Sequence, residues 1–176
     1  MKRKFNYSLV SAITLIFLFF FTAIANAQEK TKKQIKEEAK IEKQKQIALL
    51  VDSKEFVFSP KSVTPQGGRD INLNDVSYSV EFRPDSIKSY LPFFGRAYSG
   101  VGYGGDNGME FDGNPSVYTI EKTKKAYLIK VDVRGKHDFY SLMLSVYFEG
   151  NARLVISSNN RSSISYDGDI AAIQKK

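Results

Sequence analysis

The second half of the chain alternates between apolar and polar residues. From Val76 to Arg83 every second residue is apolar, and the residues between them are serine, glutamate or arginine. A period of two indicates a β-strand with one buried face. In the similar segment from Phe139 to Phe148, the residues expected to face the core are Leu142, Leu144, Val146 and Phe148. Further strands are expected at Phe56 to Phe58, Met109 to Asp112, Val117 to Lys122, Tyr127 to Val133, Arg153 to Ser157 and Ser163 to Tyr166.

Short turn sequences separate these strands, among them Gly113-Asn114-Pro115, Lys124-Lys125, Gly150-Asn151 and Asn159-Asn160. Such connections are too short for a parallel crossover, so the strands must form an antiparallel meander. A flat sheet of about eight or nine strands would leave two long edges exposed, which natural proteins avoid by curling or closing. The sequence therefore predicts a mainly β protein whose up-and-down meander forms a barrel or half-barrel. A two-sheet sandwich is the alternative.

The segment before the strands has helical composition. Thr31 and Gln34 fit a capping box, and Lys, Glu, Gln and Ala fill the following turns. Apolar residues gather only between Ile47 and Val51, so we expect the last turns to pack on the β domain and cover an open end or edge. The charged first half is either an interaction arm or a solvated spacer.

The first 27 residues have the pattern of a secretory signal peptide. Lys2, Arg3 and Lys4 precede a charge-free apolar stretch that ends at Ala25-Asn26-Ala27, a small-x-small cleavage pattern. An uncleaved anchor is the alternative, although the apolar run is shorter than the about 20 residues that span a bilayer. We expect a signal peptide at 1–27, a charged helix or tether at 28–53, and a single antiparallel β domain at 54–176. The expected location is periplasmic or secreted, with cleavage near Ala27 and no stable membrane anchor afterwards.

Charge and cysteine content exclude several classes of partner and site. The chain carries 26 Lys and Arg against 19 Asp and Glu, a formal net charge of +7. From Ile47 to Lys176, however, it has 16 basic and 15 acidic residues, so the predicted β domain is nearly neutral. A neutral domain argues against a nucleic-acid partner. The absence of cysteine excludes disulfides, a lipidated cysteine and thiolate metal sites.

One segment, residues 90–108, departs from the strand pattern because it combines aromatic residues, glycines and an arginine. Aromatic rings near a cation can stack on rings, sugars or an extended peptide, and glycines allow close approach. The alternative is that the aromatic residues belong to the core and that the arginine pairs with an internal carboxylate. The predicted ligand-binding residues are Tyr90, Phe93, Phe94, Arg96, Tyr98 and Tyr103.

Other chemical motifs are weak, and we predict no catalytic residue, metal site or cofactor. The glycines between Gly100 and Gly105 fit G-x-G-x-x-G but lack the strand before and helix after that a dinucleotide site needs. A single histidine, His137, leaves almost no basis for a histidine-rich zinc site or a serine-histidine triad. Asp167 and Asp169 would share one strand face, but a carboxylate pair acts only in a cleft. A calcium site would draw on Asp106, Asn107, Glu110 and Asp112, whose spacing misses the EF-hand pattern.

Several of these stretches together resemble a family of secreted Bacteroidetes domains of unknown function, numbered 4251. The resemblance rests on five stretches: Phe56-Val57-Phe58, Ile71-Asn72-Leu73, Tyr90 to Tyr98, Ser158 to Arg161 and Ile164 to Gly168. It covers nearly all of the chain after residue 27. It implies a cell-envelope protein with an N-terminal helix and a lipocalin-like antiparallel barrel or half-barrel, and it implies no catalytic residue.

Three classes of function remain. The first is a non-catalytic binding module that recognises a small apolar molecule, a glycan or an envelope protein through the barrel mouth and residues 90–108. The second is a structural or assembly component of the cell envelope, and the third is a carboxylate-based hydrolase. A deep apolar cavity would favour the first class, a filled barrel the second, and paired carboxylates in a cleft the third.

Overall fold

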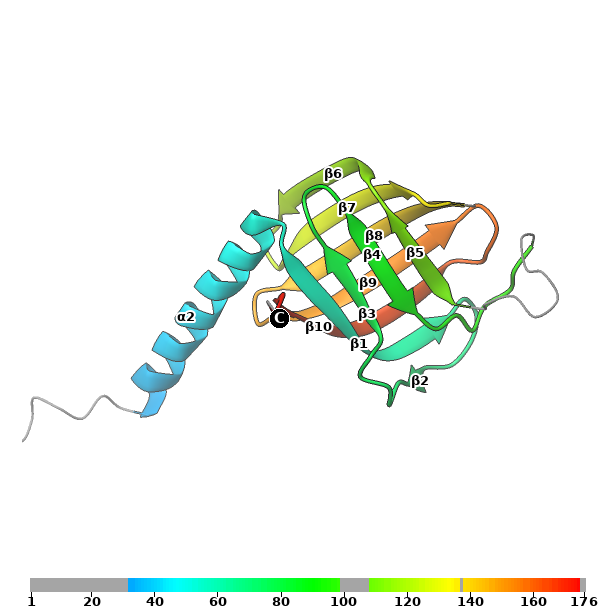
Figure 1. The fold of residues 1–176 in the computed structure, drawn as a ribbon. Coiled ribbons are helices and arrows are strands. Elements are labelled where there is room, and N and C mark those ends of the chain that lie inside the picture. The colour runs from blue at the N-terminus through cyan, green and yellow to red at the C-terminus, as the bar shows by residue number, and fades with distance from the viewer. Residues whose placement is uncertain (1–31, 99–107, 137, 175–176) are drawn as a thin grey trace, which may run out of the picture. The chain divides into compact units, whose positions relative to one another are not determined.

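The computed structural model describes residues 32–98, 108–136 and 138–174, which form one helix and one antiparallel sheet (Figure 1). The expected signal peptide, Thr31 and His137 lie outside these residues. The described residues fall into two units that divide within the helix, and the core and sites below all belong to the second, Lys40–Lys176. The elements are α2 (Lys32–Ser53), β1 (Phe56–Pro65), β2 (Ile71–Asn72), β3 (Ser79–Phe82), β4 (Ile87–Leu91), β5 (Met109–Gly113), β6 (Pro115–Lys122), β7 (Ala126–Arg134), β8 (Phe139–Tyr147), β9 (Asn151–Ser158) and β10 (Ile164–Ala172).

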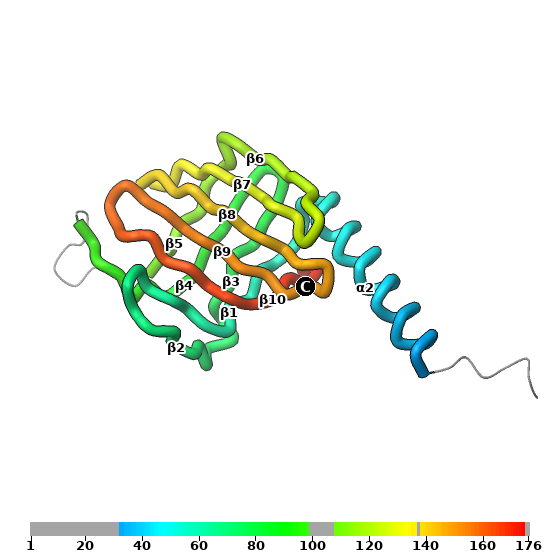
Figure 2. Tube along the Cα trace, turned by 180° about the vertical axis from the view of Figure 1, so that it is seen from behind, coloured from blue at the N-terminus to red at the C-terminus, as the bar shows by residue number. Residues whose placement is uncertain are grey.

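The strands form an up-and-down barrel with one seam. Their order in the sheet is β5-β4-β3-β1-β10-β9-β8-β7-β6, and β2 pairs with the C-terminal half of β1. The first long strand thus pairs with the last, Phe56 opposite Ala172 and Pro65 opposite Ile164. The sheet ends at β5 and β6, which follow each other in the chain without pairing, and it curls so that β3, β4 and β5 lie across β7 to β10 (Figures 1 and 2). The predicted antiparallel barrel is therefore confirmed.

Strand β1 bends where it crosses from one side of the barrel to the other. Its pairing with β10 shifts by one residue between Pro60 and Ser62, a β-bulge. Opposite the bulge stands Gly168, where an added Cβ would lie 2.1 Å from the Ser59 carbonyl oxygen. Glycine at this position lets the two backbones approach, and the bulge supplies the curvature that closes the barrel.

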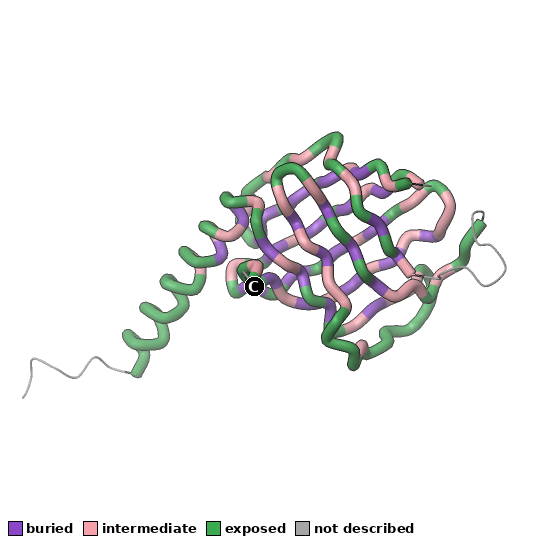
Figure 3. Tube along the Cα trace, viewed as in Figure 1, coloured by how far each residue is buried: buried purple, intermediate pink, exposed green. Residues whose placement is uncertain are grey.

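The core fills the inside of the barrel with alternate residues from every long strand (Figure 3). Leu142, Leu144 and Val146 of β8 are fully buried, as their alternation predicted, and Phe148 is partly buried against Tyr127. Phe56 stacks on Phe82 of the neighbouring strand β3 at 4.8 Å between ring centroids. Phe111 of β5 stacks on Tyr140 of β8 at 4.0 Å, which joins two strands that do not pair with each other. Because these side chains occupy the interior, stability comes from apolar packing.

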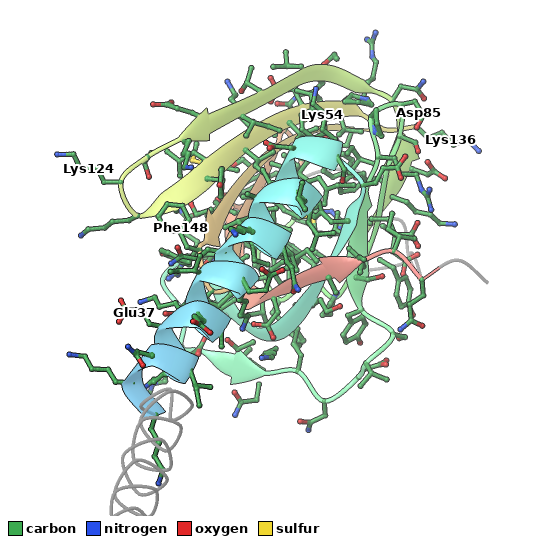
Figure 4. The ribbon with its side chains drawn as sticks, turned by 90° about the vertical axis from the view of Figure 1, so that its left-hand side faces the viewer. Glu37, Lys54, Asp85, Lys124, Lys136 and Phe148 are labelled. Atoms are coloured by element: carbon green, nitrogen blue, oxygen red, sulfur yellow. The ribbon has the colours of Figure 1, made fainter. Side chains whose placement is uncertain are left out.

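The last turns of α2 pack on the barrel, as the apolar cluster predicted. Ile47 and Val51 are buried, and Ile47 lies against Gly150 in the turn between β8 and β9. The helix ends at Ser53, and Lys54 adopts a left-handed backbone with φ of 57° (Figure 4). Its amine then lies 4.9 Å above the Tyr118 ring of β6. Among the described residues, no helix has the length and apolar content required to cross a membrane.

The observed strands differ from the predicted ones in several places, and three of these differences have a clear physical reason. Strand β3 begins at Ser79, because the Asp75 carboxylate accepts a hydrogen bond from the Ser77 amide and holds Val76 in an exposed turn. Strand β4 was not predicted, since its inward-facing residues include Ser89, which breaks the apolar alternation. The Ser89 hydroxyl is buried and donates to the Met109 carbonyl oxygen at 2.7 Å. Strand β10 extends six residues beyond Tyr166, through a stretch whose Asp and Gly residues disfavour strands.

Candidate functional site

The segment after β4 is anchored to the last strand of the barrel. The Tyr166 hydroxyl, which is fully buried, donates a hydrogen bond to the Pro92 carbonyl oxygen at 2.7 Å. Phe93 then packs on the core cluster as a partly buried side chain. Burial raises the pKa of Tyr166, an effect that the nearby positive charge of Arg161 opposes. The hydroxyl therefore stays protonated and able to donate.

Residues 96–98 run alongside residues 160–162 as a short antiparallel pair. The Arg96 amide donates to Ser162 Oγ at 3.0 Å, and the Ser162 amide donates back to the Arg96 carbonyl oxygen at 2.9 Å. The Tyr98 amide donates to the Asn160 carbonyl oxygen at 2.7 Å. Gly95 allows this approach, because a Cβ there would lie 2.4 Å from Ser162 Oγ. The backbone beneath Arg96 and Tyr98 is thus fixed by segments far apart in sequence.

The Arg161 side chain contacts two other segments of this region. Its guanidinium donates to the Gly108 carbonyl oxygen and lies 5.2 Å from the centre of the Phe93 ring. It therefore bridges the two ends of the 98–108 connection and covers a ring that is partly in the core. Sequence reasoning had assigned no role to Arg161, because its partners lie more than 50 positions away.

A groove of about 720 Å³ lies between this segment and the turn after β1. The turn reverses at Gly67, whose φ of +72° suits glycine, and closes with the Gly68 amide donating to the Pro65 carbonyl oxygen at 2.9 Å. The residues that line the groove are Pro65, Gln66, Gly67, Gly68, Arg69, Ile71, Phe94, Gly95, Arg96, Tyr98 and Ser162. Two exposed aromatic side chains and two arginines therefore share one open hollow.

The charged residues that line this groove have one sign of charge. Arg69 and Arg96 both line it, and no Asp or Glu is among the described residues that do so. The adjacent carboxylate of Asp70 accepts a hydrogen bond from the Thr64 hydroxyl at 2.7 Å. Neither arginine forms an ion pair with a carboxylate in the described part of the chain. The two charged residues that line the groove are therefore both basic.

The structure separates the predicted ligand-binding residues into groups. Phe94, Arg96 and Tyr98 line the groove, with exposed fractions of 48% for Phe94 and 68% for Tyr98. Phe93 lies beneath them against the core, as the alternative of a core aromatic anticipated for this position. Tyr90 lies on β4 with its ring 5.7 Å from that of Tyr78, and it does not line the groove. Tyr103 lies outside the described residues.

A second hollow, of about 640 Å³, lies where β7 turns into β8. Its charged residues are of both signs: Arg134 and Lys136 stand beside Asp138. The Asp138 carboxylate accepts hydrogen bonds from the Ser158 hydroxyl at 2.7 Å and the Phe139 amide at 2.8 Å. That carboxylate thus supports the turn, and this hollow has a weaker charge preference than the groove.

The predicted carboxylate pair, Asp167 and Asp169, takes part in ion pairs on the surface of the barrel. Asp167 and Asp169 do share the outer face of β10, but each has a cation beside it: Arg153 lies 3.7 Å from Asp167, and Lys61 contacts Asp169. No cluster of three or more metal-ligating side chains occurs within residues 32–98, 108–136 and 138–174. The G-x-G-x-x-G stretch, Asp106 and Asn107 lie outside these ranges, while Glu110 and Asp112 are exposed on β5.

Comparisons with known proteins identify a family. The model of a family described as a domain of unknown function, DUF4251, matches residues 38–170. A solved structure of a DUF4251 family protein from Bacteroides eggerthii DSM 20697 is similar, with a TM-score of 0.59 and 16% identity over 74% of this chain and 87% of that one. At this identity the likeness supports the fold alone. No curated protein matches. Since the family model covers most of the chain, this protein belongs to the DUF4251 family.

Proposed function

We propose that this protein is a non-catalytic binding module that recognises its partner through the groove lined by Phe94, Arg96 and Tyr98. The observation that carries the proposal is the exposure of two aromatic rings beside an arginine, on backbone that is hydrogen-bonded to residues 160–162. Aromatic and arginine side chains dominate binding hot spots, and a fixed backbone lowers the entropy lost on binding. Burying such rings would otherwise be favourable, so their exposure needs a reason.

The packed core bears on the type of ligand. Large side chains such as Phe56, Phe58, Leu144 and Tyr166 are fully buried inside the barrel. A small apolar molecule could enter the interior only by displacing them, which costs packing energy. Recognition of a glycan or an envelope protein at the outside is therefore favoured over an apolar ligand held inside the barrel.

The same observation supports a second candidate, a structural or assembly component of the cell envelope. A filled barrel is what a scaffold requires, since its interior contributes stability and its surface contributes contacts. In this role the groove would hold a neighbouring envelope subunit permanently. Isolation of the protein in a stable stoichiometric complex would favour assembly, whereas reversible capture of a ligand would favour a binding module.

Export is part of the proposal, and it rests on the signal-like pattern of residues 1–27. The purified envelope protein should begin at or within a residue or two of Gln28. N-terminal sequencing measures this directly, and a chain that retains Met1 would contradict it.

The groove is tested by comparing capture with stability. Wild-type protein and the variants Phe94→Ala, Arg96→Ala and Tyr98→Ala are immobilised, exposed to an extract of the native envelope, and assayed by quantitative mass spectrometry. Each variant should fail to capture the envelope component that the wild-type protein enriches. Its free energy of unfolding should fall by less than about 1 kcal/mol, because the truncated side chains are exposed. Tyr147→Ala changes an exposed tyrosine on β8 that does not line the groove, so this matched control should still capture the component.

A different result is expected from Phe93→Ala, which removes a ring that packs on the core and should destabilise the fold by about 3 kcal/mol. If the three groove variants were destabilised as much as this one, the rings would be structural. The recognition proposal would then fail.

A further inference from the structure

The charge of the groove restricts its ligand. Arg69 and Arg96 come from two different connections, the turn after β1 and the segment after β4, yet both line the same hollow of about 720 Å³. Each arginine presents a planar fork of donors that matches a carboxylate or a sulfate group. No Asp or Glu is among the described residues that line the hollow, so an anionic group that enters it would lie against two arginines.

The remaining walls restrict the ligand further. Phe94 and Tyr98 present exposed ring surface beside Arg96. The segment after β1 adds the polar and small residues Gln66, Gly67 and Gly68, together with the apolar Pro65 and Ile71. Sugar rings have apolar C–H faces that stack on aromatic rings, and hydroxyl groups that hydrogen-bond to polar walls. An open groove with both kinds of surface fits a chain of pyranose rings that carries negative charges.

An acidic peptide is the competing ligand. Extended peptides usually bind by adding a strand to an exposed sheet edge, which requires unpaired backbone groups. Here the Arg96 amide, the Arg96 carbonyl oxygen and the Tyr98 amide are already hydrogen-bonded to residues 160–162. Side chains therefore supply most of the recognition in the groove, which favours a glycan.

We propose that the groove binds an anionic glycan, with Arg69 and Arg96 holding its carboxylate or sulfate groups and Phe94 and Tyr98 stacking on its sugar rings. This inference rests on the proposed function and specifies the class of ligand that the binding module recognises. A carboxylate and a sulfate group on a pyranose ring are both oxyanions that the arginines could bind. Separate probes distinguish the two kinds of sugar.

Isothermal titration of the purified protein tests the proposal with four probes: an oligogalacturonate, a sulfated dextran oligosaccharide, neutral dextran and poly-L-glutamate. At least one anionic sugar should bind at least about tenfold more tightly than neutral dextran and poly-L-glutamate, and its affinity should fall as salt rises. The sugar that binds identifies the oxyanion as carboxylate or sulfate.

Variants locate the binding. Arg69→Ala and Arg96→Ala should each weaken binding at least about tenfold, and Arg96→Lys should recover only part of it, since lysine keeps the charge but loses the fork. Arg83→Ala removes an arginine that pairs with Glu81 outside the groove, and it should leave the affinity unchanged. Equal losses for Arg83→Ala and Arg96→Ala would show non-specific charge attraction and overturn the proposal.

The two proposals fail separately. If no anionic sugar binds, or if poly-L-glutamate binds as tightly, the glycan proposal is overturned, while loss of envelope capture by the groove variants would still support recognition at this surface. If an anionic sugar binds equally well to wild-type protein and to all groove variants, the groove is not its site. That result would overturn the glycan proposal, while envelope capture by the same variants would still decide the proposed function.

Discussion

The hydroxyl of Tyr166 on β10 donates a 2.7 Å hydrogen bond to the carbonyl oxygen of Pro92, 74 positions earlier in the chain. This contact joins the strand that closes the barrel to the segment that carries Phe93, Phe94 and Arg96. Four residues before Tyr166, Ser162 pairs with the backbone of Arg96. The geometry of the groove therefore depends on the correct placement of β10 against the segment after β4, although the two are far apart in the chain.

Removing the Tyr166 hydroxyl should weaken this connection. Tyr166→Phe leaves the partly buried Pro92 carbonyl oxygen without its donor and should reduce the free energy of unfolding by about 1–3 kcal/mol. Tyr147→Phe, which alters an exposed tyrosine on β8, should change it by less than about 0.5 kcal/mol. Chemical denaturation of both variants measures the difference. Equal stability of the Tyr166→Phe variant and the wild type would show that the bond contributes little.

The closing of the barrel at Gly168 gives a second prediction. Gly168→Ala places a methyl group against the Ser59 carbonyl and should destabilise the protein by about 3 kcal/mol, because the bulged backbone of β1 must move. Gly67→Ala is the matched control: it has no atom within 4 Å of the added methyl group, and it should cost only about 1 kcal/mol from its left-handed backbone. If the two substitutions reduce the free energy of unfolding equally, the close approach of the backbones at the bulge does not require glycine.

Much of the fold was predictable because strand alternation is a local signal. Leu142, Leu144 and Val146 reveal the buried face of β8 without reference to any other strand. The same logic failed where a polar residue is buried, as at Ser89, and where a side-chain hydrogen bond imposes a turn, as at Val76 beside Asp75. In both cases the deciding interaction is a hydrogen bond, which hydrophobic periodicity does not register.

That alternation also gives a third prediction. Leu144 is fully buried between Ile129 and Leu154 on the neighbouring strands, so Leu144→Asp should cost more than about 3 kcal/mol by burying an unpaired charge. At the next position Ser145 lies opposite Arg153 on the outer face, and Ser145→Asp should cost less than about 1 kcal/mol. Thermal and urea unfolding of the two variants checks this. Similar losses at both positions would contradict a strand buried on one face.

The candidate site was predictable only in part. The composition of residues 90–98 pointed to the exposed aromatics and to Arg96, but a local pattern cannot separate Phe93, which packs on the core, from Phe94, which does not. Arg69 was missed because it joins the groove only through the pairing of β1 with β10, a long-range contact. The pairing of Arg69 with Arg96 in one groove is a property of the fold, and no single stretch of sequence contains it.

A final prediction concerns alkaline pH. Burial raises the pKa values of Tyr118 and Tyr166 above the ordinary 10.0, with Arg161 partly opposing the rise at Tyr166. Above pH 10 the unfolded chain loses these protons before the folded protein does, so ionisation favours unfolding. The stability that these groups contribute is therefore complete below pH 10 and is lost above it, by at most about 1.4 kcal/mol per pH unit for each tyrosine.

Tyr118→Phe isolates one of these tyrosines. The Tyr118 hydroxyl is buried without a hydrogen-bond partner among the described residues, so its removal should leave stability at pH 7 unchanged or slightly higher. Between pH 10 and 11.5 the variant should lose stability less steeply than the wild type, because one proton fewer is released on unfolding. Urea unfolding at a series of pH values gives both slopes. Superimposable slopes would mean that Tyr118 ionises as readily in the folded protein as in the unfolded chain.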